Sequence, residues 1–365
     1  MAITVLIVDD SLFFQKRLTD IIEEHPQLRV VGVASNGKQA LSMTLEKKPD
    51  VITMDYEMPL MDGIHAVRQI MSQRPTPILM FSSLTYDGAK TTLSALEAGA
   101  VDFMPKSFKE IAKNPEQLKD KLHQRILLIS RRRNLALNNK LIEHDTKSKS
   151  SASQSSTPRV AEAPPNNAQV SRKLNEKVKI IAIGASTGGP IALSEILKHL
   201  PQNFSLPILV IQHMPENFTK AFAERLNSQC QVRVVHADDG MTIENGVVYL
   251  APGGHQMMIN QKDGRRIKVL KGDDRLLYKP SVDVTLTSAA NVWGEGLLTL
   301  ILTGMGSDGC EGSRIVKQKG GVVWSQDEAS SIIYGMPMAV AKEKLTDRVI
   351  SLTEIPGQLK KAFGC

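Results

Sequence analysis

Short apolar runs alternate with helix-length amphipathic segments along the first 122 residues. Five such runs, each of four or five residues and rich in Val, Ile, Leu and Met, lie at residues 4–8, 30–34, 51–54, 78–81 and 101–104. Buried strands of a parallel sheet have this near-continuous apolar pattern, because helices cover both faces of the sheet. We therefore predict a doubly wound parallel-sheet domain over residues 1–122, with its functional residues at the carboxyl ends of the strands.

The same alternation returns later and predicts a second doubly wound, Rossmann-like α/β domain over residues 178–365. Its apolar runs at 178–183, 206–211 and 297–302 each end in a turn of small or polar residues. The pair Asp263-Gly264, between two short strand patterns, adds a β-hairpin to this domain.

The segment between the domains, residues 123–177, has a different composition. It begins with an apolar helical stretch that ends near Ser130. From Lys147 to Lys173 it consists mainly of Ser, Ala, Gln, Pro and Asn, with too few large apolar residues to bury a core. We predict a helical extension followed by a flexible basic linker, part of which is extended at Pro164-Pro165.

The net charge of +7 falls within this linking segment. Residues 123–177 contain eleven Lys or Arg residues and four Asp or Glu residues, so the two flanking domains together are close to neutral. Solvated helix faces and linkers commonly carry such charge. A DNA-binding output domain would itself be basic, and we therefore predict no nucleic-acid partner.

Cysteine usage and hydropathy indicate the compartment. The cysteines are unclustered and lack metal-ligand spacing, so we predict three free thiols, at Cys230, Cys310 and Cys365. The chain opens on a strand pattern rather than a charged and apolar leader, and no run of about 18 apolar residues occurs. These features predict a cytoplasmic protein without direct membrane insertion.

Acidic residues gather at the strand ends of the first domain. Asp9 and Asp10 follow the first apolar run, and Asp55 follows the third. Ser82 and Lys106 follow the fourth and fifth runs. Carboxylates that meet at one sheet edge repel each other unless a hard cation neutralises them, and Mg²⁺ is the usual cation where phosphate is involved. A helix cap explains one such Asp equally well, but it does not explain the whole group.

In the second domain, the run ending at Ile183 leads into a turn of small residues that contains Ser186. The pattern Gly184-x-Ser186-x-Gly188 matches a nucleophile elbow, whose glycines are expected to permit a strained turn without a Cβ clash. A phosphate-binding turn of a dinucleotide fold would use similar residues. The turn alone therefore leaves both interpretations open.

The residue after the next strand favours the nucleophile. A dinucleotide fold needs an acidic residue about 20 positions past the glycines, whereas here His213 follows the run at 206–211. Neighbouring strands lie about 4.8 Å apart, so an imidazole at one strand end can approach a serine at the next. A serine needs such a base because its own hydroxyl is weakly nucleophilic.

A carboxylate is needed to orient the imidazole. Asp308 follows the strand at 297–302 on a glycine-rich loop, whereas Asp283 does not follow an apolar run and is typical of a helix start. We therefore favour Asp308 over Asp283. A second histidine, His255, precedes the hairpin and is a candidate pocket residue, although a structural role fits it as well.

The first domain resembles response-regulator receiver domains, which are flavodoxin-like. The motifs that carry the resemblance are Val8-Asp9-Asp10, Met54-Asp55-Tyr56-Glu57-Met58-Pro59-Leu60-Met61-Asp62-Gly63, Phe81-Ser82-Ser83 and Pro105-Lys106. The resemblance implies that Asp55 is phosphorylated by a histidine kinase and that Lys106 holds the phosphoryl group. It also implies that Ser82 and Phe103 take part in the conformational switch.

The same resemblance implies a Mg²⁺ site. Asp10, Asp55 and the Glu57 carbonyl would bind the ion, and Asp9 would assist through water. One departure from the family pattern concerns the lysine: a proline usually follows it, but here Pro105 precedes Lys106 and Ser107 follows.

The second domain resembles the catalytic domain of chemotaxis protein-glutamate methylesterases, the CheB type. The resemblance rests on Gly184-Ala185-Ser186-Thr187-Gly188-Gly189-Pro190, Gln212-His213-Met214-Pro215, Ala251-Pro252-Gly253-Gly254-His255, Pro280-Ser281-Val282-Asp283 and Leu302-Thr303-Gly304-Met305-Gly306-Ser307-Asp308-Gly309. It implies hydrolysis of γ-glutamyl methyl esters, and deamidation of glutamines, on the cytoplasmic domains of methylated chemoreceptors.

In this interpretation Ser186 attacks, His213 shuttles the proton and Asp308 orients the imidazole. Backbone N–H groups near Thr187 and Met305 would stabilise the oxyanion, and the esterase reaction would need no cofactor. The receiver would cover the active site until a chemotaxis histidine kinase phosphorylates it. The alternatives are a receiver-regulated DNA-binding protein and a receiver joined to a non-catalytic ligand-binding domain.

Overall fold

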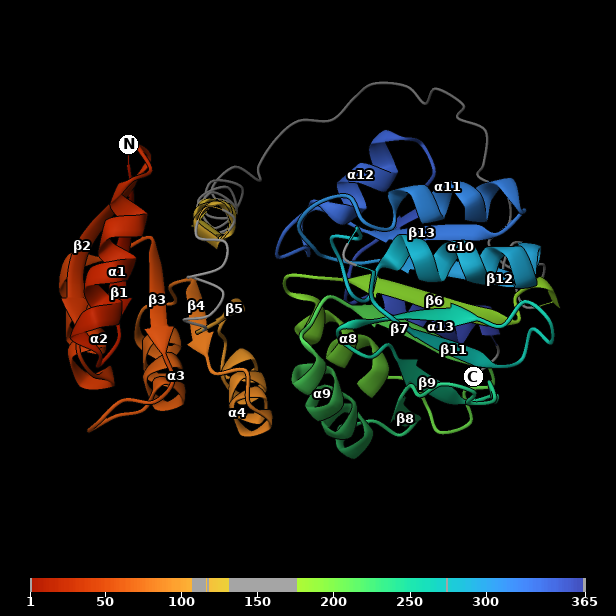
Figure 1. Ribbon diagram of the computed structural model, residues 1–365, viewed down its shortest axis with the longest axis horizontal. Coiled ribbons are helices and arrows are strands. Elements are labelled where there is room, and N and C mark those ends of the chain that lie inside the picture. Colours follow the sequence, from red (N-terminus) through yellow and green to blue (C-terminus); the bar gives the residue numbers. More distant parts are fainter. Residues whose placement is uncertain (1, 107–115, 117, 131–175, 274, 364–365) are drawn as a thin grey trace, which may run out of the picture.

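The computed structural model describes residues 2–106, 116, 118–130, 176–273 and 275–363. Its first domain is a parallel five-stranded sheet in the order β2-β1-β3-β4-β5 (Figure 1). The strands are β1 Ile3–Val8, β2 Leu28–Ala34, β3 Val51–Asp55, β4 Ile78–Ser82 and β5 Asp102–Pro105. The helices that alternate with them are α1 Leu12–Glu23, α2 Gly37–Lys47, α3 Gly63–Gln73 and α4 Tyr86–Glu97. The predicted doubly wound α/β fold is confirmed for this domain.

Each of these helices starts at a residue that caps it. The side chains of the N-cap residues accept a hydrogen bond from a backbone N–H three residues later, and these residues are Ser11, Asn36, Asp62 and Thr85. Such caps satisfy one of the backbone donors that a helix start leaves without a partner. The sequence thus sets where the chain turns from each strand end into the next helix.

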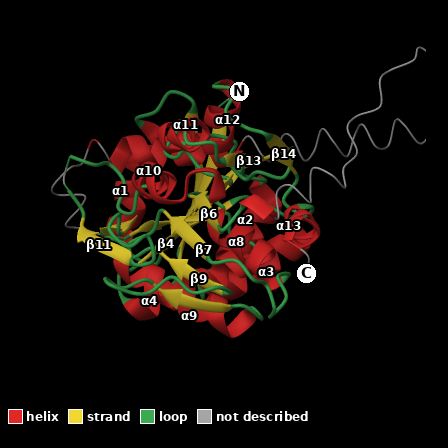
Figure 2. Ribbon diagram, turned by 90° about the vertical axis from the view of Figure 1, so that its right-hand side faces the viewer, coloured by secondary structure: helices red, strands yellow, loops and turns green. Residues whose placement is uncertain are grey.

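The second domain is a parallel seven-stranded sheet in the order β14-β13-β12-β6-β7-β9-β8. Its strands are β6 Ile180–Ala185, β7 Ile208–Gln212, β8 Arg233–His236, β9 Val247–Leu250, β12 Leu297–Ile301, β13 Val322–Gln326 and β14 Arg348–Ile350. Its helices are α8 Gly189–Lys198, α9 Glu216–Gln229, α10 Val282–Trp293, the short 3₁₀ helix η1 Gly294–Gly296, α11 Cys310–Gln318, α12 Met336–Lys342 and α13 Ile355–Phe363. Viewed after a quarter turn, helices flank this sheet on both sides (Figure 2).

The predicted hairpin is present as a separate antiparallel pair, β10 His255–Ile259 and β11 Ile267–Lys271. Residues 118–130 are helical, as predicted for the extension. The linker predicted between Lys147 and Lys173 lies outside the described residues, as does Ser107 after Lys106. Within the described residues, no helix has the length and hydropathy of a membrane span, and Cys230 and Cys310 are free thiols; Cys365 lies outside them.

The expectation that both glycines of the serine turn relieve strain is wrong for Gly184. Gly184 is part of β6 and pairs with Ile301 and Ile211 of the neighbouring strands. A Cβ at this position would lie 2.5 Å from Val282 Cγ1, so the absence of a side chain allows α10 to pack closely on the strand. Gly188 has φ of 77° and does supply the left-handed backbone that the turn needs.

The two domains contact each other through α4 and β5 of the first and α9 of the second. Phe103 stacks on Phe218 with ring centroids 4.5 Å apart. Arg225 Nε donates to Glu97 Oε1 at 2.9 Å and Arg225 Nη1 donates to Ser94 Oγ at 3.0 Å. These contacts place α4 and the outer strand β5 of the first sheet next to the second domain.

Candidate active site

Ser186 and His213 follow the ends of adjacent strands. Ala185 at the end of β6 pairs with Gln212 at the end of β7, and the amide of His213 donates to the Ala185 carbonyl at 3.1 Å. Gln212 Nε2 donates to the Ser186 carbonyl at 2.9 Å, which ties the serine turn to the neighbouring strand. Ser186 and His213 line one cavity of about 600 Å³, although their side chains share no hydrogen bond in the described structure.

The imidazole of His213 is bound to the predicted acid. His213 Nε2 lies 2.8 Å from Asp308 Oδ2, and both side chains are nearly buried. Because a carboxylate can only accept, Nε2 carries the proton and Nδ1 is left as an acceptor. Nδ1 is buried and has no hydrogen-bond partner among the described residues. Nδ1 is therefore the nitrogen that could accept a proton from the Ser186 hydroxyl.

Asp308 is held as a carboxylate by donors on α10. Ser281 Oγ donates to Asp308 Oδ1 at 3.0 Å, and the amides of Val282 and Asp283 donate at 2.7 and 3.0 Å. Burial by itself raises the pKa of Asp308, but the hydrogen bond and charge of His213, together with the backbone donors, outweigh burial and lower the pKa.

Asp283 has a different environment. It lies in the first turn of α10, as its sequence pattern suggested, and its Oδ1 accepts from the amides of Gly309 and Gly312 at 2.9 and 2.6 Å. It therefore caps α11 from another element. Burial and the nearby Asp308 charge raise the pKa of Asp283.

His255 lies outside the cavity lining. Its Nδ1 is 3.0 Å from the Gly253 carbonyl, and the residue begins β10. This geometry fits the structural role that the sequence left open, rather than a role as a second base.

Two backbone amides near the serine remain available. Thr187 follows Ser186 directly and Met305 belongs to the glycine-rich loop after β12; both line the cavity. Neither amide donates a hydrogen bond to the described residues. Donors without partners beside a nucleophile are what an oxyanion site requires.

The first domain supplies part of the cavity wall through Asp102, a residue that the sequence analysis did not single out. Asp102 lies at the start of β5 and is only 6% exposed. Its Oδ2 accepts from Thr187 Oγ1 at 3.1 Å and lies 2.9 Å from Arg125 Nη1. Burial raises the pKa of Asp102, and the Arg125 charge partly offsets this effect. In the sequence, Asp102 stands inside the apolar run at 101–104. An acid in such a run indicates a buried charge that has a partner.

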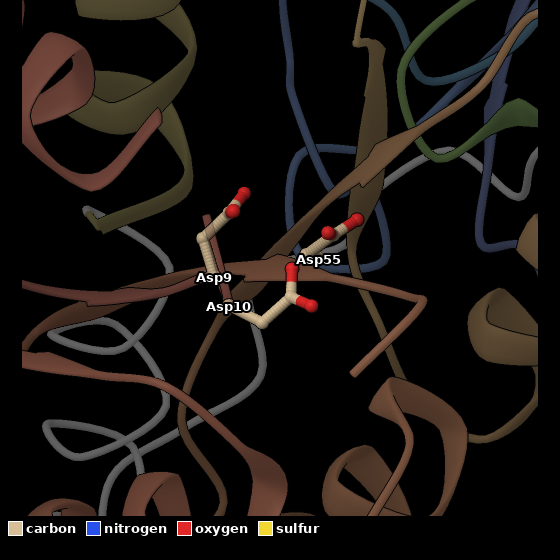
Figure 3. Close-up of side chains that lie close together, drawn as sticks. All are labelled: Asp9, Asp10 and Asp55. Carbon is tan, nitrogen blue, oxygen red and sulfur yellow. The ribbon is translucent and has the colours of Figure 1, made fainter. Parts of the chain in front are cut away.

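At the carboxyl edge of the first sheet, three acids form a cluster (Figure 3). Oxygen atoms of Asp9, Asp10 and Asp55 lie within 4.8 Å of one another. Lys106 Nζ lies 2.8 Å from Asp9 Oδ2 and 2.6 Å from Asp55 Oδ2. Burial raises the pKa of Asp55, with a smaller contribution from Asp9, although Lys106 lowers it in part. These hard oxygen donors and their mutual repulsion fit a Mg²⁺ ion.

The other predicted receiver residues lie on β4, on β5 and in the loop after β3. Ser82 is buried, and its hydroxyl donates to the Gly88 carbonyl at 3.2 Å and accepts from Thr92 Oγ1 at 2.6 Å, both on α4. Phe103 is buried against Phe218 of the second domain. Glu57 is exposed in the loop that follows β3.

Comparison with known proteins agrees with both resemblances. The CheB methylesterase family model matches residues 181–359, and the response regulator receiver domain model matches residues 5–122. A protein-glutamate methylesterase/protein-glutamine glutaminase 1 of Saccharophagus degradans is 52% identical over 360 residues, which cover 97% of this chain and 98% of that protein. The protein-glutamate methylesterase/protein-glutamine glutaminase of Vibrio parahaemolyticus is 50% identical over 369 residues, covering 100% of both chains.

Among solved structures, the CheB methylesterase catalytic domain of Thermotoga maritima is 40% identical, with a TM-score of 0.48, and the match covers 50% of this chain and 97% of that one. Identity near one half over almost the full length of the Saccharophagus and Vibrio proteins extends through both domains. The chain therefore belongs to the protein-glutamate methylesterase/protein-glutamine glutaminase family, in which a receiver domain precedes a CheB methylesterase domain.

Proposed function

We propose that this protein hydrolyses γ-glutamyl methyl esters of chemoreceptors, and deamidates selected receptor glutamines, by a Ser-His-Asp mechanism. The observation that carries the proposal is the His213–Asp308 hydrogen bond of 2.8 Å beside the Ser186 turn. Both activities appear in the names of the full-length relatives. A non-catalytic binding domain would not need the buried His213–Asp308 pair. The alternative of DNA binding is not favoured.

The reaction follows from the positions of the groups. Ser186 Oγ attacks the ester carbonyl carbon while its proton moves to His213 Nδ1, the nitrogen that has no partner. The resulting imidazolium is stabilised by Asp308, and the amides of Thr187 and Met305 donate to the oxyanion. His213 then gives this proton to the methoxy oxygen as its bond to the carbonyl carbon breaks, which releases methanol, or to the amide nitrogen of a glutamine, which releases ammonia. Water hydrolyses the acyl-enzyme by the same proton route.

For the first domain we propose phosphorylation of Asp55 by a chemotaxis histidine kinase. Asp9, Asp10 and Asp55 would hold Mg²⁺ together with the Glu57 carbonyl, with Asp9 acting through water. The ion would supply positive charge for the phosphoryl oxygens. Lys106 already lies within 2.6 Å of Asp55 Oδ2 and would hold the phosphoryl group.

We further propose that the domain limits are 1–122 for the receiver and 178–365 for the esterase, and that the receiver restricts access to the esterase site. Asp102 and Arg125 form one wall of the cavity that contains Ser186. Phosphorylation would shift the docked equilibrium through Ser82, which contacts α4, and Phe103, which contacts α9. The expected substrates and kinase imply that the enzyme acts in the cytoplasm, which cell fractionation would test.

The decisive experiment measures methanol released from methylated receptor cytoplasmic fragments by the full-length protein, before and after treatment with acetyl phosphate and Mg²⁺. We expect release in both states and faster release after phosphorylation. No methanol from the treated wild-type protein would contradict the proposed activity. Mass spectrometry of receptor peptides from the same reactions detects deamidation as a mass change at glutamine.

A further inference from the structure

The side chain of Tyr278 covers one face of the His213 imidazole. The two ring centroids are 4.1 Å apart and the planes differ by 6°. Tyr278 lies in the loop before α10 and forms part of the cavity wall beside Ser186. Burial, and then the charge of Asp308, raise the pKa of Tyr278, so its ring is neutral in the range where the esterase acts.

The backbone of this loop is held independently of the Tyr278 side chain. Gln256 is buried, and its Nε2 donates to the Tyr278 carbonyl at 2.7 Å while its Oε1 accepts from the Ser281 amide at 2.8 Å. The Gly254 amide donates to the Lys279 carbonyl at 3.0 Å. A substitution at position 278 should therefore change the ring and leave the path of the loop in place.

The hydroxyl of Tyr278 does not anchor the ring. It makes no hydrogen bond with the part of the chain that the structure describes. It lies beside Gly306, where an added Cβ would be 3.0 Å from the hydroxyl oxygen. The contact with His213 is thus made by the aromatic face.

Asp308 and Tyr278 restrict different motions of His213. The Nε2–Asp308 hydrogen bond fixes one ring atom but permits the ring to swing about that contact. A parallel aromatic face in contact with the imidazole opposes this swing, because tilting the ring would break the stacked arrangement. The direction of Nδ1 depends on both contacts.

We propose that Tyr278 is a positioning residue for the esterase reaction: its ring fixes the plane of the His213 imidazole so that Nδ1 faces the Ser186 hydroxyl. The inference rests on the proposed function. The face of a neutral aromatic ring also attracts a cation, so Tyr278 favours the imidazolium that forms when Ser186 loses its proton.

The test compares full-length wild-type protein with Tyr278→Phe, Tyr278→Leu and the control Leu270→Ala. Leu270 is exposed on β11 and lies outside the cavity lining. Methanol release gives kcat and KM separately. The rate at which a serine-directed phosphonate labels Ser186 measures nucleophilicity without the receptor substrate. Near-UV circular dichroism checks folding, and Tyr278→Met replaces the leucine variant should that variant not fold.

We expect Tyr278→Leu to lower kcat and the labelling rate about 10- to 100-fold with KM within about 3-fold, since small displacements of a catalytic group have effects of this size. Tyr278→Phe and Leu270→Ala should stay within about 2-fold of wild type.

Three results would overturn the proposal: unchanged kcat in Tyr278→Leu, a rise in KM alone, or an equal loss in Tyr278→Phe. A rise in KM alone would make the residue a substrate contact. A loss in the phenylalanine variant would assign the effect to the hydroxyl. Failure of the proposed function itself is distinguishable, because the wild-type protein would then neither release methanol nor be labelled at Ser186.

Discussion

At the scale of single residues, Asp308 and Asp283 are neighbouring carboxylates with different hydrogen-bond partners. Asp308 accepts from His213 and from three donors of the segment that starts α10. Asp283 accepts from two amides at the start of α11. The pKa of Asp308 is lowered and that of Asp283 is raised, which indicates that the fold stabilises charge on Asp308 and disfavours it on Asp283.

We predict that Asp308→Asn lowers kcat by about 10²- to 10⁴-fold, because an amide cannot stabilise the imidazolium and can hold the wrong tautomer. Asp283→Asn should keep kcat within about 5-fold, since its carbonyl oxygen can still accept from Gly309 and Gly312. Methanol release by the two purified variants measures the difference. Equal losses in both would remove the distinction between the two acids.

Ser186 and His213 give the second prediction at this scale. Ser186→Ala should abolish methanol release while thermal unfolding stays close to wild type, because the hydroxyl makes no hydrogen bond with the described residues. His213→Ala should be equally inactive, and the double variant scarcely worse, because members of such a unit are not additive. Retention of more than about a tenth of wild-type turnover by Ser186→Ala would exclude it as nucleophile.

At the scale of elements, parallel strands bring their carboxyl ends to one edge. Asp9, Asp10 and Asp55 come from the ends of β1 and β3, which are neighbours in the sheet, and Lys106 follows β5. No two of these strands are neighbours in sequence, but their common direction makes the side chains converge. The same rule brings Ser186 and His213 together in the second sheet.

We predict that acetyl phosphate modifies Asp55 in a Mg²⁺-dependent reaction. Asp55 is part of the acid cluster and its Oδ2 lies next to Lys106 Nζ. Borohydride trapping followed by mass spectrometry identifies the residue, and Asp55→Ala serves as the matched control. Modification of Asp10 with Asp55 unmodified, or equal yield in the presence of a chelator, would contradict the assignment.

At the scale of the whole molecule, residues of both domains line the cavity that contains Ser186. Thr187 Oγ1 donates to Asp102 Oδ2 across the interface, and Phe103 stacks on Phe218. Asn217 Nδ2 also donates to the Leu84 carbonyl at 2.8 Å. We propose that a receiver held in this position restricts access of the substrate to Ser186.

We predict that deletion of residues 1–145 raises basal esterase activity, while Asp55→Ala leaves the full-length protein at its low basal level. If occlusion is the whole effect, the isolated esterase domain should equal or exceed the phosphorylated full-length enzyme in kcat/KM. Methanol release by each form provides the comparison. A truncated domain that is folded by circular dichroism but slower than the unphosphorylated protein would eliminate occlusion.

A point substitution in the domain interface tests the same occlusion without truncation. Arg225→Ala removes contacts to Glu97 and Ser94 of α4, and we expect it to raise basal activity of the unphosphorylated protein about 2- to 5-fold, the range that a partly exposed ion pair supports. The same substitution in the isolated esterase domain is the control and should have no effect. An increase in the isolated domain would place the cause outside the interface.

Periodicity in the sequence predicted the five strands of the first sheet and three strands of the second, β6, β7 and β12, but not β8, β9, β13 or β14. The Asp263-Gly264 turn predicted the hairpin, and the strand ends predicted which functional residues converge. They predicted that Asp9, Asp10 and Asp55 would meet, and that Asp308 rather than Asp283 would reach His213. These predictions succeed because parallel strands place their carboxyl ends at one edge whatever the details of packing.

Only the tertiary structure decided the contacts made by loops and by the other domain. It assigned Nε2 of His213 to Asp308, stacked Tyr278 on the imidazole and brought Asp102 to Thr187, 85 positions away in sequence. It also showed that Gly184 lacks a side chain where α10 packs on β6, and that the turn does not require this glycine. Such contacts have no periodic signature, because the position of each side chain depends on close packing against residues that are distant in sequence.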